Sequence, residues 1–220
     1  REYKTAATTL APDRLATIIY TSGTTGDPKG VMLTHGAIVA NLLDVDTMIN
    51  IVQEDQALSL LPLSHVFERT VVYLYLFKGV SLTFAESLNT VGRDMRRVRP
   101  TVMTGVPRVY EKLHARVLET IEQNSALRQV LFRWALTVGR ICAEAVRNGK
   151  SLSIGARSSH WVADRLVLSK IRASTSGLLR FVVSGGAPLP MPVAEFLFAV
   201  GIPSRSIVFV RERSNHVPGI

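Results

Sequence analysis

Short apolar runs alternate along the chain with longer segments whose apolar residues recur at helical spacing. The short runs have the length of β-strands and are rich in β-branched residues; they cover residues 15–20, 57–63, 80–85, 101–106 and 178–185. The helical spacing covers residues 36–49, 65–79, 87–100, 107–121, 126–147, 161–172 and 191–202. Apolar strands that alternate with helices are typical of a parallel sheet covered on both faces. The pattern therefore predicts an α/β fold with a mostly parallel sheet layered with helices.

The residue types at the segment ends support these boundaries. Thr34 is a suitable N-cap for the helix at 36–49, and Gly79 is a suitable end for the helix at 65–79. Pro107 stands in the first turn of its helix, where the missing N–H costs nothing. Asn148–Ser159 is rich in Gly and Ser and predicts a surface loop.

The composition is that of an ordinary folded protein, with 47% hydrophobic and 20% charged residues in 220. The longest apolar run, Thr70–Phe77, is too short for a transmembrane helix, and Arg1–Arg14 lacks the apolar core of a signal peptide. The single Cys142 excludes an internal disulfide, and its place on an apolar helical stripe predicts a core residue. We therefore expect a cytoplasmic location. Since the chain begins with Arg1, we also expect it to be a piece of a longer protein.

The formal net charge of +9 raises the question of an anionic partner. The densest basic group consists of Arg93, Arg96, Arg97 and Arg99. It has no interleaved aromatic residues and matches no nucleic-acid-binding motif, so we expect no nucleic acid partner. A solvated helix face explains the group, and an anionic membrane surface or substrate is the alternative. Peripheral membrane association is compatible with this charge.

The segment YTSGTTGDPKGVMLTHG, Tyr20–Gly36, concentrates hydroxyls, glycines and one lysine between two apolar runs. Glycines let a backbone approach a phosphate closely, hydroxyls and backbone amides donate hydrogen bonds to it, and a lysine supplies positive charge. The spacing is not that of a Walker A loop, because Pro28 occupies the place of its second glycine. A flexible surface turn is the alternative. The density of donors directly after an apolar strand favours a phosphate cradle at the carboxyl end of a sheet strand.

This segment resembles, nearly residue for residue, the phosphate loop of the adenylate-forming superfamily, which includes acyl-CoA synthetases, luciferases and peptide-synthetase adenylation domains. LPLSHVFE (Leu61–Glu68) and VVSGGAPLP (Val182–Pro190) resemble two further segments of that family, in the same order and at similar spacing. Thr101–Val117, between them, is most similar to long-chain fatty acid–CoA ligases. The resemblance covers about Leu15–Pro203 and implies part of the large N-terminal domain of such an enzyme.

The resemblance implies an ATP-dependent acid–thiol ligase. A long-chain fatty carboxylate attacks the α-phosphate of Mg-ATP, giving acyl-adenylate and pyrophosphate, and the thiol of CoA then displaces AMP. The positions implied to bind the phosphates are Thr21, Ser22, Gly23, Thr24, Thr25, Gly26 and Lys29.

Two further sites carry over from the resemblance. His65 is implied as the catalytic residue at the junction of carboxylate and α-phosphate, and Gly185, Gly186 and Ala187 as one wall of the adenine and acyl pocket. An ordinary histidine at a strand end and an ordinary glycine turn are the alternatives. Arg69 stands where some relatives carry a tryptophan that gates the acyl tunnel, so we expect no aromatic gate. The remaining histidines show no ligand spacing, and we expect no metal site built by the protein.

The family pattern stops after Pro203. Ser204–Ile220 does not resemble the Tyr-Gly-x-Thr-Glu segment of the family, whose glutamate holds Mg²⁺, and the small C-terminal domain with its catalytic lysine is not matched either. We interpret residues 1–203 as a partial AMP-binding (adenylation) domain and residues 204–220 as an atypical tail, with a frameshift or misassembled gene end as the hypothesis for its origin.

Three functions stay open at this point. The first is a fragment of a long-chain fatty acid–CoA ligase, with the activity inferred for the parent protein. The second is a non-catalytic remnant that binds nucleotide or acyl chain. The third is another adenylating enzyme, such as an aryl-CoA ligase or a fatty acyl-AMP ligase. We expect the 220-residue chain alone to release little or no pyrophosphate.

Overall fold

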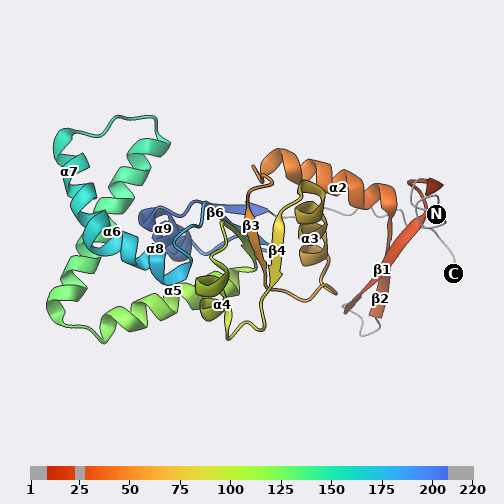
Figure 1. Ribbon diagram of the computed structural model, residues 1–220, viewed down its shortest axis with the longest axis horizontal. Helices are drawn as coiled ribbons and strands as arrows, with labels where there is room; N and C mark the ends of the chain where they lie inside the picture. Colours follow the sequence, from red (N-terminus) through yellow and green to blue (C-terminus); the bar gives the residue numbers. More distant parts are fainter. Residues whose placement is uncertain (1–8, 23–27, 208–220) are drawn as a thin grey trace.

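The computed structural model describes residues 9–22 and 28–207, whose strands form two separate sheets (Figure 1). The first sheet is an antiparallel hairpin of β1 and β2, and the second contains five parallel strands in the order β4-β3-β5-β6-β7. The strands are β1 Leu15–Ser22, β2 Pro28–Thr34, β3 Gln56–Ser59, β4 Ser81–Phe84, β5 Val102–Gly105, β6 Phe181–Gly185 and β7 Ser204–Ile207. The parallel sheet confirms the predicted fold class. Its strand β7 lies within the segment that we interpreted as an atypical tail.

Helices precede or connect the parallel strands and pack on both faces of their sheet (Figure 1). They are α2 His35–Met48, α3 Val66–Lys78, α4 Val91–Val98, α5 Pro107–Glu122, α6 Ala126–Arg147, α7 Ile154–Ala163, α8 Ser169–Thr175 and α9 Met191–Val200, with a short π-helical segment η1 Asp164–Leu168 between α7 and α8. Thr34 caps α2 by accepting a hydrogen bond from the backbone N–H of Ala37 at 3.2 Å, and α3 ends at Gly79, whose φ is 70°. Both boundaries were predicted from the sequence.

The predicted loop at Asn148–Ser159 is only partly correct. Helix α7 begins inside it, because Ser153 acts as an N-cap and accepts a hydrogen bond from the backbone N–H of Ala156 at 3.2 Å. The helix expected at 161–172 is consequently the continuation of α7 through η1 into α8. A serine that caps a helix was interpreted as a loop residue.

Side chains from alternate strand positions enter two hydrophobic clusters, one on each face of the sheet. Leu58, Met103 and Val182 pack with α4, α5, α6, α8 and α9. Their strand neighbours, Ala57, Val102 and Val183, pack with α2 and α3 on the other face. Cys142 is 4% exposed in α6, which confirms it as a core residue. Within the part of the chain described, no helix is both long enough and apolar enough to cross a membrane.

A buried carboxylate joins the amino ends of three neighbouring strands. Asp55 precedes β3 and is 3% exposed; Arg180, before β6, donates from Nη1 to both of its carboxylate oxygens at 2.6 Å. Thr101, before β5, donates its hydroxyl to Asp55 at 2.6 Å, and the backbone N–H of Val52 donates at 3.0 Å. Burial alone would raise the pKa of Asp55, but these hydrogen bonds and the arginine charge outweigh it and lower the pKa.

Candidate active site

The strand order reverses at β3, and this creates the crevice where open parallel sheets bind ligands. The chain passes from β3 through α3 to β4 on one side, and then returns through α4 to β5 on the other side of β3. The loops that leave the carboxyl ends of β3 and β5 therefore separate in opposite directions. Ligands of such sheets bind at this topological switch point. His65 lies in the segment that follows β3, so the fold places it at this edge.

His65 is the N-cap residue of α3. Its backbone N–H donates to the carbonyl of Pro62 at 2.9 Å, and its carbonyl accepts from the backbone N–H of Arg69 at 3.1 Å. The backbone of His65 is thus fixed on both sides. Its imidazole is exposed and makes no hydrogen bond with the residues at 9–22 or 28–207. The ring is therefore free to meet a ligand.

Phe67, two residues later, holds the start of α3 against the carboxyl end of β6. Its ring lies directly over Gly185, since a Cβ on that glycine would stand 2.0 Å from Cε2 of the ring. Phe67 is 2% exposed, and Gly185 is buried as well. Only a residue without a side chain allows this approach, so Gly185 is needed for the packing of α3 on the sheet.

The next two residues complete the predicted glycine turn. Gly186 has φ of 80°, in the region that favours glycine, and a Cβ there would meet no atom within 4 Å. The carbonyl of Ala187 accepts a hydrogen bond from the hydroxyl of Ser184 at 3.3 Å. Gly186 and Ala187 are exposed. The structure therefore brings His65 and Gly185–Ala187 to the same edge of the sheet, while their roles stay predictions.

Glu68 is a site residue that was not predicted from the sequence. It is fully buried, and its Oε1 accepts hydrogen bonds from the hydroxyl of Ser59 and from the backbone N–H of Leu60, the latter at 3.2 Å. Its Oε2 has no hydrogen-bond partner among the described residues. Burial raises the pKa of the Glu68 carboxyl. Glu68 thus ties the first turn of α3 to the end of β3 and fixes both ends of the segment that carries His65. A carboxylate on the buried side of an otherwise apolar helix is the signal in the sequence that could have identified it.

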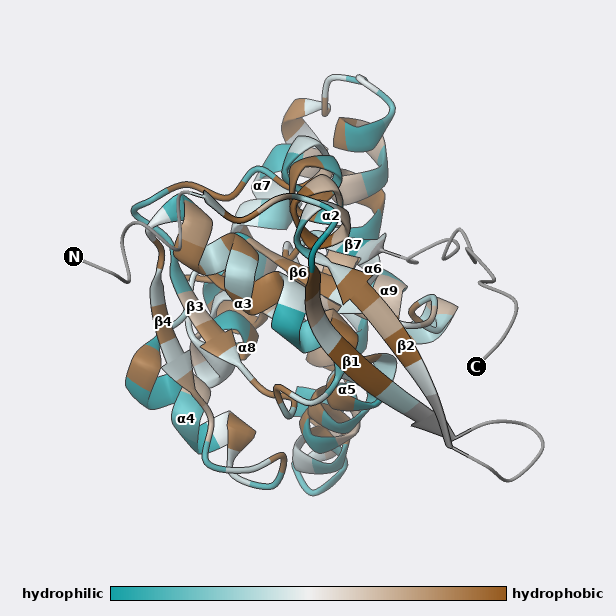
Figure 2. Cartoon of the chain, turned by 90° about the vertical axis from the view of Figure 1, so that its right-hand side faces the viewer, coloured by the Kyte–Doolittle hydropathy of each residue, from teal (hydrophilic) through white to brown (hydrophobic). Residues whose placement is uncertain are grey.

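The expected phosphate loop has a different setting from the one predicted. We expected it to connect a strand of the main sheet to a helix. Instead β1 continues into β2 as an antiparallel hairpin outside the parallel sheet, at one end of the molecule (Figures 1 and 2). In the hairpin register Thr21 pairs with Lys29, and Ser22 pairs with Pro28. Thr21, Ser22 and Lys29 therefore sit at the two strand ends that flank the loop, whereas Gly23, Thr24, Thr25 and Gly26 lie outside the described residues.

The hairpin exposes apolar side chains. Tyr20 and Met32 are 72% and 63% exposed, and Figure 2 shows hydrophobic stretches along both strands.

The predicted setting of the phosphate loop was wrong because the residues after Pro28 were counted as loop, although they pair with β1 along its whole length.

Arg69 connects this hairpin to the segment that carries His65. Its Nη1 donates to the hydroxyl of Thr17 in β1 at 2.7 Å, and its Nε donates to the carbonyl of Leu63 at 3.0 Å. We expected no aromatic gate at this position. In the structure Arg69 has a linking role, because its guanidinium group joins the hairpin to the loop before α3.

The described residues contain no group of three or more His, Cys, Asp or Glu side chains that could hold a metal ion.

Comparison with known proteins identifies a family and several relatives. The family model described as "AMP-binding enzyme" matches residues 2–209. Over 187 residues the chain is 38% identical to the peroxisomal long chain acyl-CoA synthetase 6 of Arabidopsis thaliana. This alignment covers 84% of this chain and 25% of that protein. It is also 38% identical over 209 residues to the putative fatty-acid–CoA ligase fadD11 of Mycobacterium tuberculosis, covering 93% of this chain and 36% of that protein. The chain thus spans between a quarter and about a third of the length of these relatives.

A solved structure supports the fold. The adenylation domain of a carboxylate reductase from Mycobacterium chelonae superimposes with a TM-score of 0.58 and 26% identity, covering 90% of this chain and 27% of that one.

Proposed function

Because the chain belongs to the AMP-binding enzyme family, we propose that it forms part of a long-chain fatty acid–CoA ligase. The proposed reaction has two steps. An oxygen of the fatty carboxylate attacks the α-phosphorus of ATP, which is bound as its magnesium complex, and the bond to the bridging oxygen breaks so that pyrophosphate leaves. The thiolate of CoA then attacks the acyl carbon, and AMP leaves. Two relatives at 38% identity, one named as a long chain acyl-CoA synthetase and one as a putative fatty-acid–CoA ligase, support the choice of substrate class.

The single observation that carries this proposal is the contact of Phe67 with Gly185. It holds the N-terminus of α3, where the exposed imidazole of His65 stands, against the glycine turn at the end of β6. We assign His65 to the junction of the carboxylate and the α-phosphate, where a neutral imidazole donates one hydrogen bond and an imidazolium also stabilises negative charge. We assign Gly185, Gly186 and Ala187 to a wall of the adenine and acyl pocket.

The hairpin loop would supply the remaining charge stabilisation. Backbone N–H groups and hydroxyls of a glycine-rich loop, together with one lysine, can neutralise a triphosphate and orient it for attack. We assign this role to Thr21, Ser22, Gly23, Thr24, Thr25, Gly26 and Lys29. Arg69 would hold the loop in register with His65 through its hydrogen bond to Thr17 in β1.

The same proposal covers the extent and location of the domain. We propose residues 1–203 as part of the adenylation domain; the match to the family model extends to residue 209. We also propose a cytoplasmic location with peripheral membrane association, in agreement with the net charge of +9.

The test measures binding of intermediate analogues to the chain by thermal unfolding. A ligand that binds only the folded state raises Tm, and at a fixed concentration the rise grows with the logarithm of its affinity. We expect a non-hydrolysable palmitoyl-adenylate analogue to raise Tm more than AMP and palmitate added together at the same concentrations. The matching benzoyl-adenylate analogue should raise it less. His65→Ala should reduce the shift given by the palmitoyl analogue, whereas the control His160→Ala in α7 should leave it unchanged.

Three results would contradict the proposal. Equal shifts for the palmitoyl and benzoyl analogues would contradict the preference for a long alkyl chain, and a larger shift for the benzoyl analogue would favour an aryl substrate. The absence of a shift with either analogue would show that the proposed site does not bind an adenylate.

A further inference from the structure

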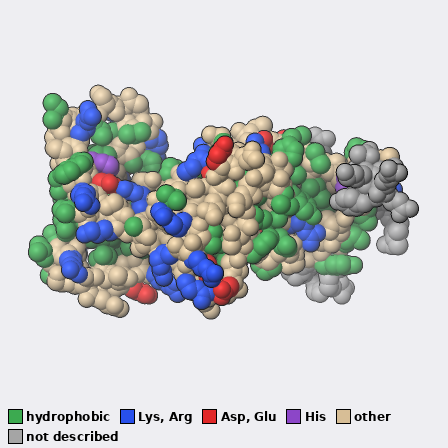
Figure 3. Space-filling view, viewed as in Figure 1, with side chains coloured by type: hydrophobic (Ala, Val, Ile, Leu, Met, Phe, Trp, Pro, Cys, Tyr) green, Lys and Arg blue, Asp and Glu red, His purple; other side chains and the backbone are tan. Residues whose placement is uncertain are grey.

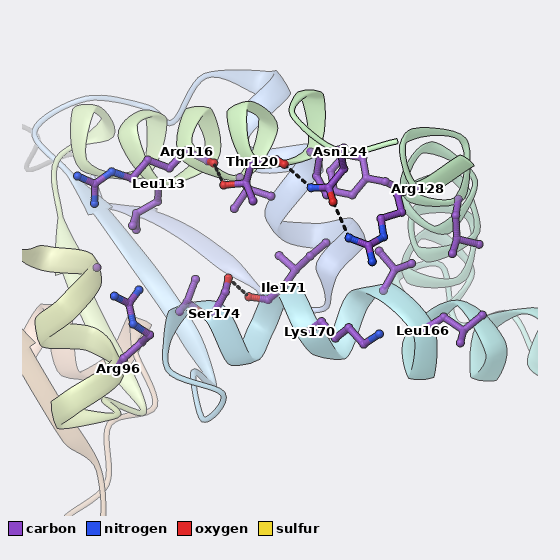
Figure 4. Close-up of a pocket in the computed structure, with 17 residues that line it drawn as sticks. Arg96, Leu113, Arg116, Thr120, Asn124, Arg128, Leu166, Lys170, Ile171 and Ser174 are labelled. Atoms are coloured by element: carbon purple, nitrogen blue, oxygen red, sulfur yellow. Dashed lines mark hydrogen bonds between the residues drawn. The ribbon is translucent and has the colours of Figure 1, made fainter. Parts of the chain in front are cut away.

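A cavity of about 590 Å³ lies between α4, α5, the first half of α6, η1 and α8. None of the described residues that line it belongs to the hairpin, to the His65 segment or to the glycine turn. Figure 4 shows α5 along one side of the cavity and α8 along the other, with Leu113 and Ile171 pointing into the space between them. The volume falls within the range of small-molecule sites. This cavity is therefore a candidate binding site separate from the candidate active site.

The floor of the cavity is apolar. Successive turns of α5 contribute one side of it, and α6, η1 and α8 contribute the rest; the residues are Leu113, Val117, Ile121, Phe132, Val167 and Ile171. Among the described lining residues the one aromatic ring belongs to Phe132, which is 4% exposed and so offers no open face on which a nucleotide base could stack. Such a floor suits an alkyl chain better than an aromatic ligand.

The rim of the cavity is basic. Arg96, Arg116, Arg128 and Lys170 come from four different helices, and no Asp or Glu is among the described residues that line the cavity. None of the four makes an ion pair within residues 9–22 and 28–207; Arg128 donates to the neutral side chain of Asn124 at 2.7 Å, and Arg116 to the backbone carbonyl of Asn89 at 3.4 Å. Lys and Arg side chains also gather on this part of the surface in Figure 3. The positive charge at the rim is thus not neutralised locally, and it favours an anionic ligand.

Two of these cations approach one another at one end of the cavity. The Nη1 atoms of Arg116 and Arg96 lie 3.3 and 3.8 Å from the point where a Cβ on Gly92 would stand. No carboxylate of a described residue separates the two guanidinium groups in the lining of the cavity. Guanidinium groups bind carboxylates through charge-assisted hydrogen bonds, often in pairs. In Figure 4, Arg96 and Arg116 stand at the end of the cavity opposite Leu166, with the apolar floor between.

We propose that this cavity binds a long-chain fatty acid anion, with its carboxylate between Arg96 and Arg116 and its alkyl chain along the apolar side of α5. The proposal goes beyond the proposed function, because this site lies outside the candidate active site and takes no part in a reaction. We choose an anion with a single alkyl chain because two guanidinium groups lie together at one end of the cavity and the floor is a continuous apolar strip.

The test is a calorimetric titration: dodecanoate is added to the chain below its micellar concentration, and the heat of binding is measured. We expect saturation at this cavity and binding of the uncharged dodecanol that is at least about tenfold weaker. The variant Arg96→Gln/Arg116→Gln should weaken dodecanoate binding by about tenfold or more. The matched control is Arg97→Gln/Arg108→Gln, which removes two exposed arginines from the same two helices without touching the cavity. This control should change the affinity less than twofold.

A second pair of variants tests the alkyl chain. Leu166→Gln lies in the cavity at 44% exposure and should weaken binding of dodecanoate, whereas Leu127→Gln, at 78% exposure outside the cavity, should not. Circular dichroism of each variant establishes that it is folded.

The proposal would be overturned by the absence of saturable binding, by equal losses in the cavity variant and its arginine control, or by equal affinities for dodecanoate and dodecanol. A cavity variant that loses binding to phosphatidylserine vesicles but keeps its affinity for dodecanoate would likewise overturn it, in favour of a membrane contact.

Discussion

Replacing Gly185 by alanine tests whether the contact between α3 and β6 organises the candidate active site. The new Cβ would stand 2.0 Å from Cε2, 2.2 Å from Cζ and 2.5 Å from Cδ2 of Phe67. Phe67 is 2% exposed and packs in the cluster formed by α2, α3 and the sheet, so its rigid ring cannot turn away without moving α3. Overpacking of a core costs about 1–3 kcal/mol. Since three ring atoms clash at once, we expect a loss near the upper end, about 3 kcal/mol of unfolding free energy in urea titrations.

The neighbouring glycine provides the control. Gly186→Ala places a Cβ in open space, and its cost is the backbone strain of a positive φ, about 1–2 kcal/mol. A double-mutant cycle then separates the two effects. Phe67→Ala alone should cost about 3–5 kcal/mol. In that background Gly185→Ala should lose most of its penalty, because the clashing ring is gone, whereas Gly186→Ala should cost the same as before. A Gly185→Ala penalty that is equal in both backgrounds would refute this reasoning.

Three further predictions concern charged side chains. Burial raises the pKa of Glu68, so the folded state binds the proton of its carboxyl group more tightly than the unfolded state does. The unfolding free energy of the wild type should therefore fall as the pH rises from the ordinary glutamate range through the folded-state pKa. Urea titrations of Glu68→Gln over the same pH range should lack this fall. Arg69→Met and Thr17→Val should show a coupling of about 1 kcal/mol in a double-mutant cycle, and additive losses would argue against their hydrogen bond. Arg180→Met should lower the unfolding free energy by about 2–3 kcal/mol at neutral pH, because it leaves the carboxylate of Asp55 buried without its charge partner. The loss stays below that of a fully buried pair because the side chain of Arg180 is 38% exposed to solvent. Because the pKa of Asp55 is lowered, this stabilisation is present above the ordinary carboxyl pKa and disappears as the pH falls through the folded-state pKa; a penalty that does not shrink in acid would contradict the pairing.

The elements of the parallel sheet could be predicted because their signals are local. The strands β3, β4, β5 and β6 are short apolar runs, and the helices between them have apolar residues at helical spacing. The hairpin could not be predicted in the same way. Strand β2 is defined by its pairing with β1, and the Pro-Lys-Gly sequence at its start has the composition of a loop. A strand whose identity depends on a partner across a turn is poorly marked by its own residues.

The residues of the candidate site show the same difference between local sequence signals and contacts with distant residues. His65 and Gly185–Ala187 could be named from short motifs, because each motif is continuous in the sequence. Glu68 and Arg69 stand beside His65 in the sequence and were still not assigned positioning roles. Their importance depends on where their partners lie, and the hydrogen bond from Arg69 reaches a residue 52 positions away in the chain. The residues that position the site therefore require the fold, even when the residues of the site itself do not.

The first turn of α3 sets the relations among all three parts of the candidate site. Consecutive residues of an α-helix point about 100° apart, so neighbours on one turn reach different surroundings. From this single turn Phe67 contacts the glycine turn after β6, Glu68 bonds to the end of β3, and Arg69 bonds to the hairpin. His65, at the N-cap of the same turn, consequently keeps a fixed position relative to each of them. A rotation of this turn would change the distances from His65 to the hairpin and to the glycine turn together. Substitutions at Phe67, Glu68 and Arg69 should therefore alter binding of the phosphate and acyl ends of an adenylate analogue in parallel, whereas substitutions in the hairpin loop should alter binding of the phosphate end alone.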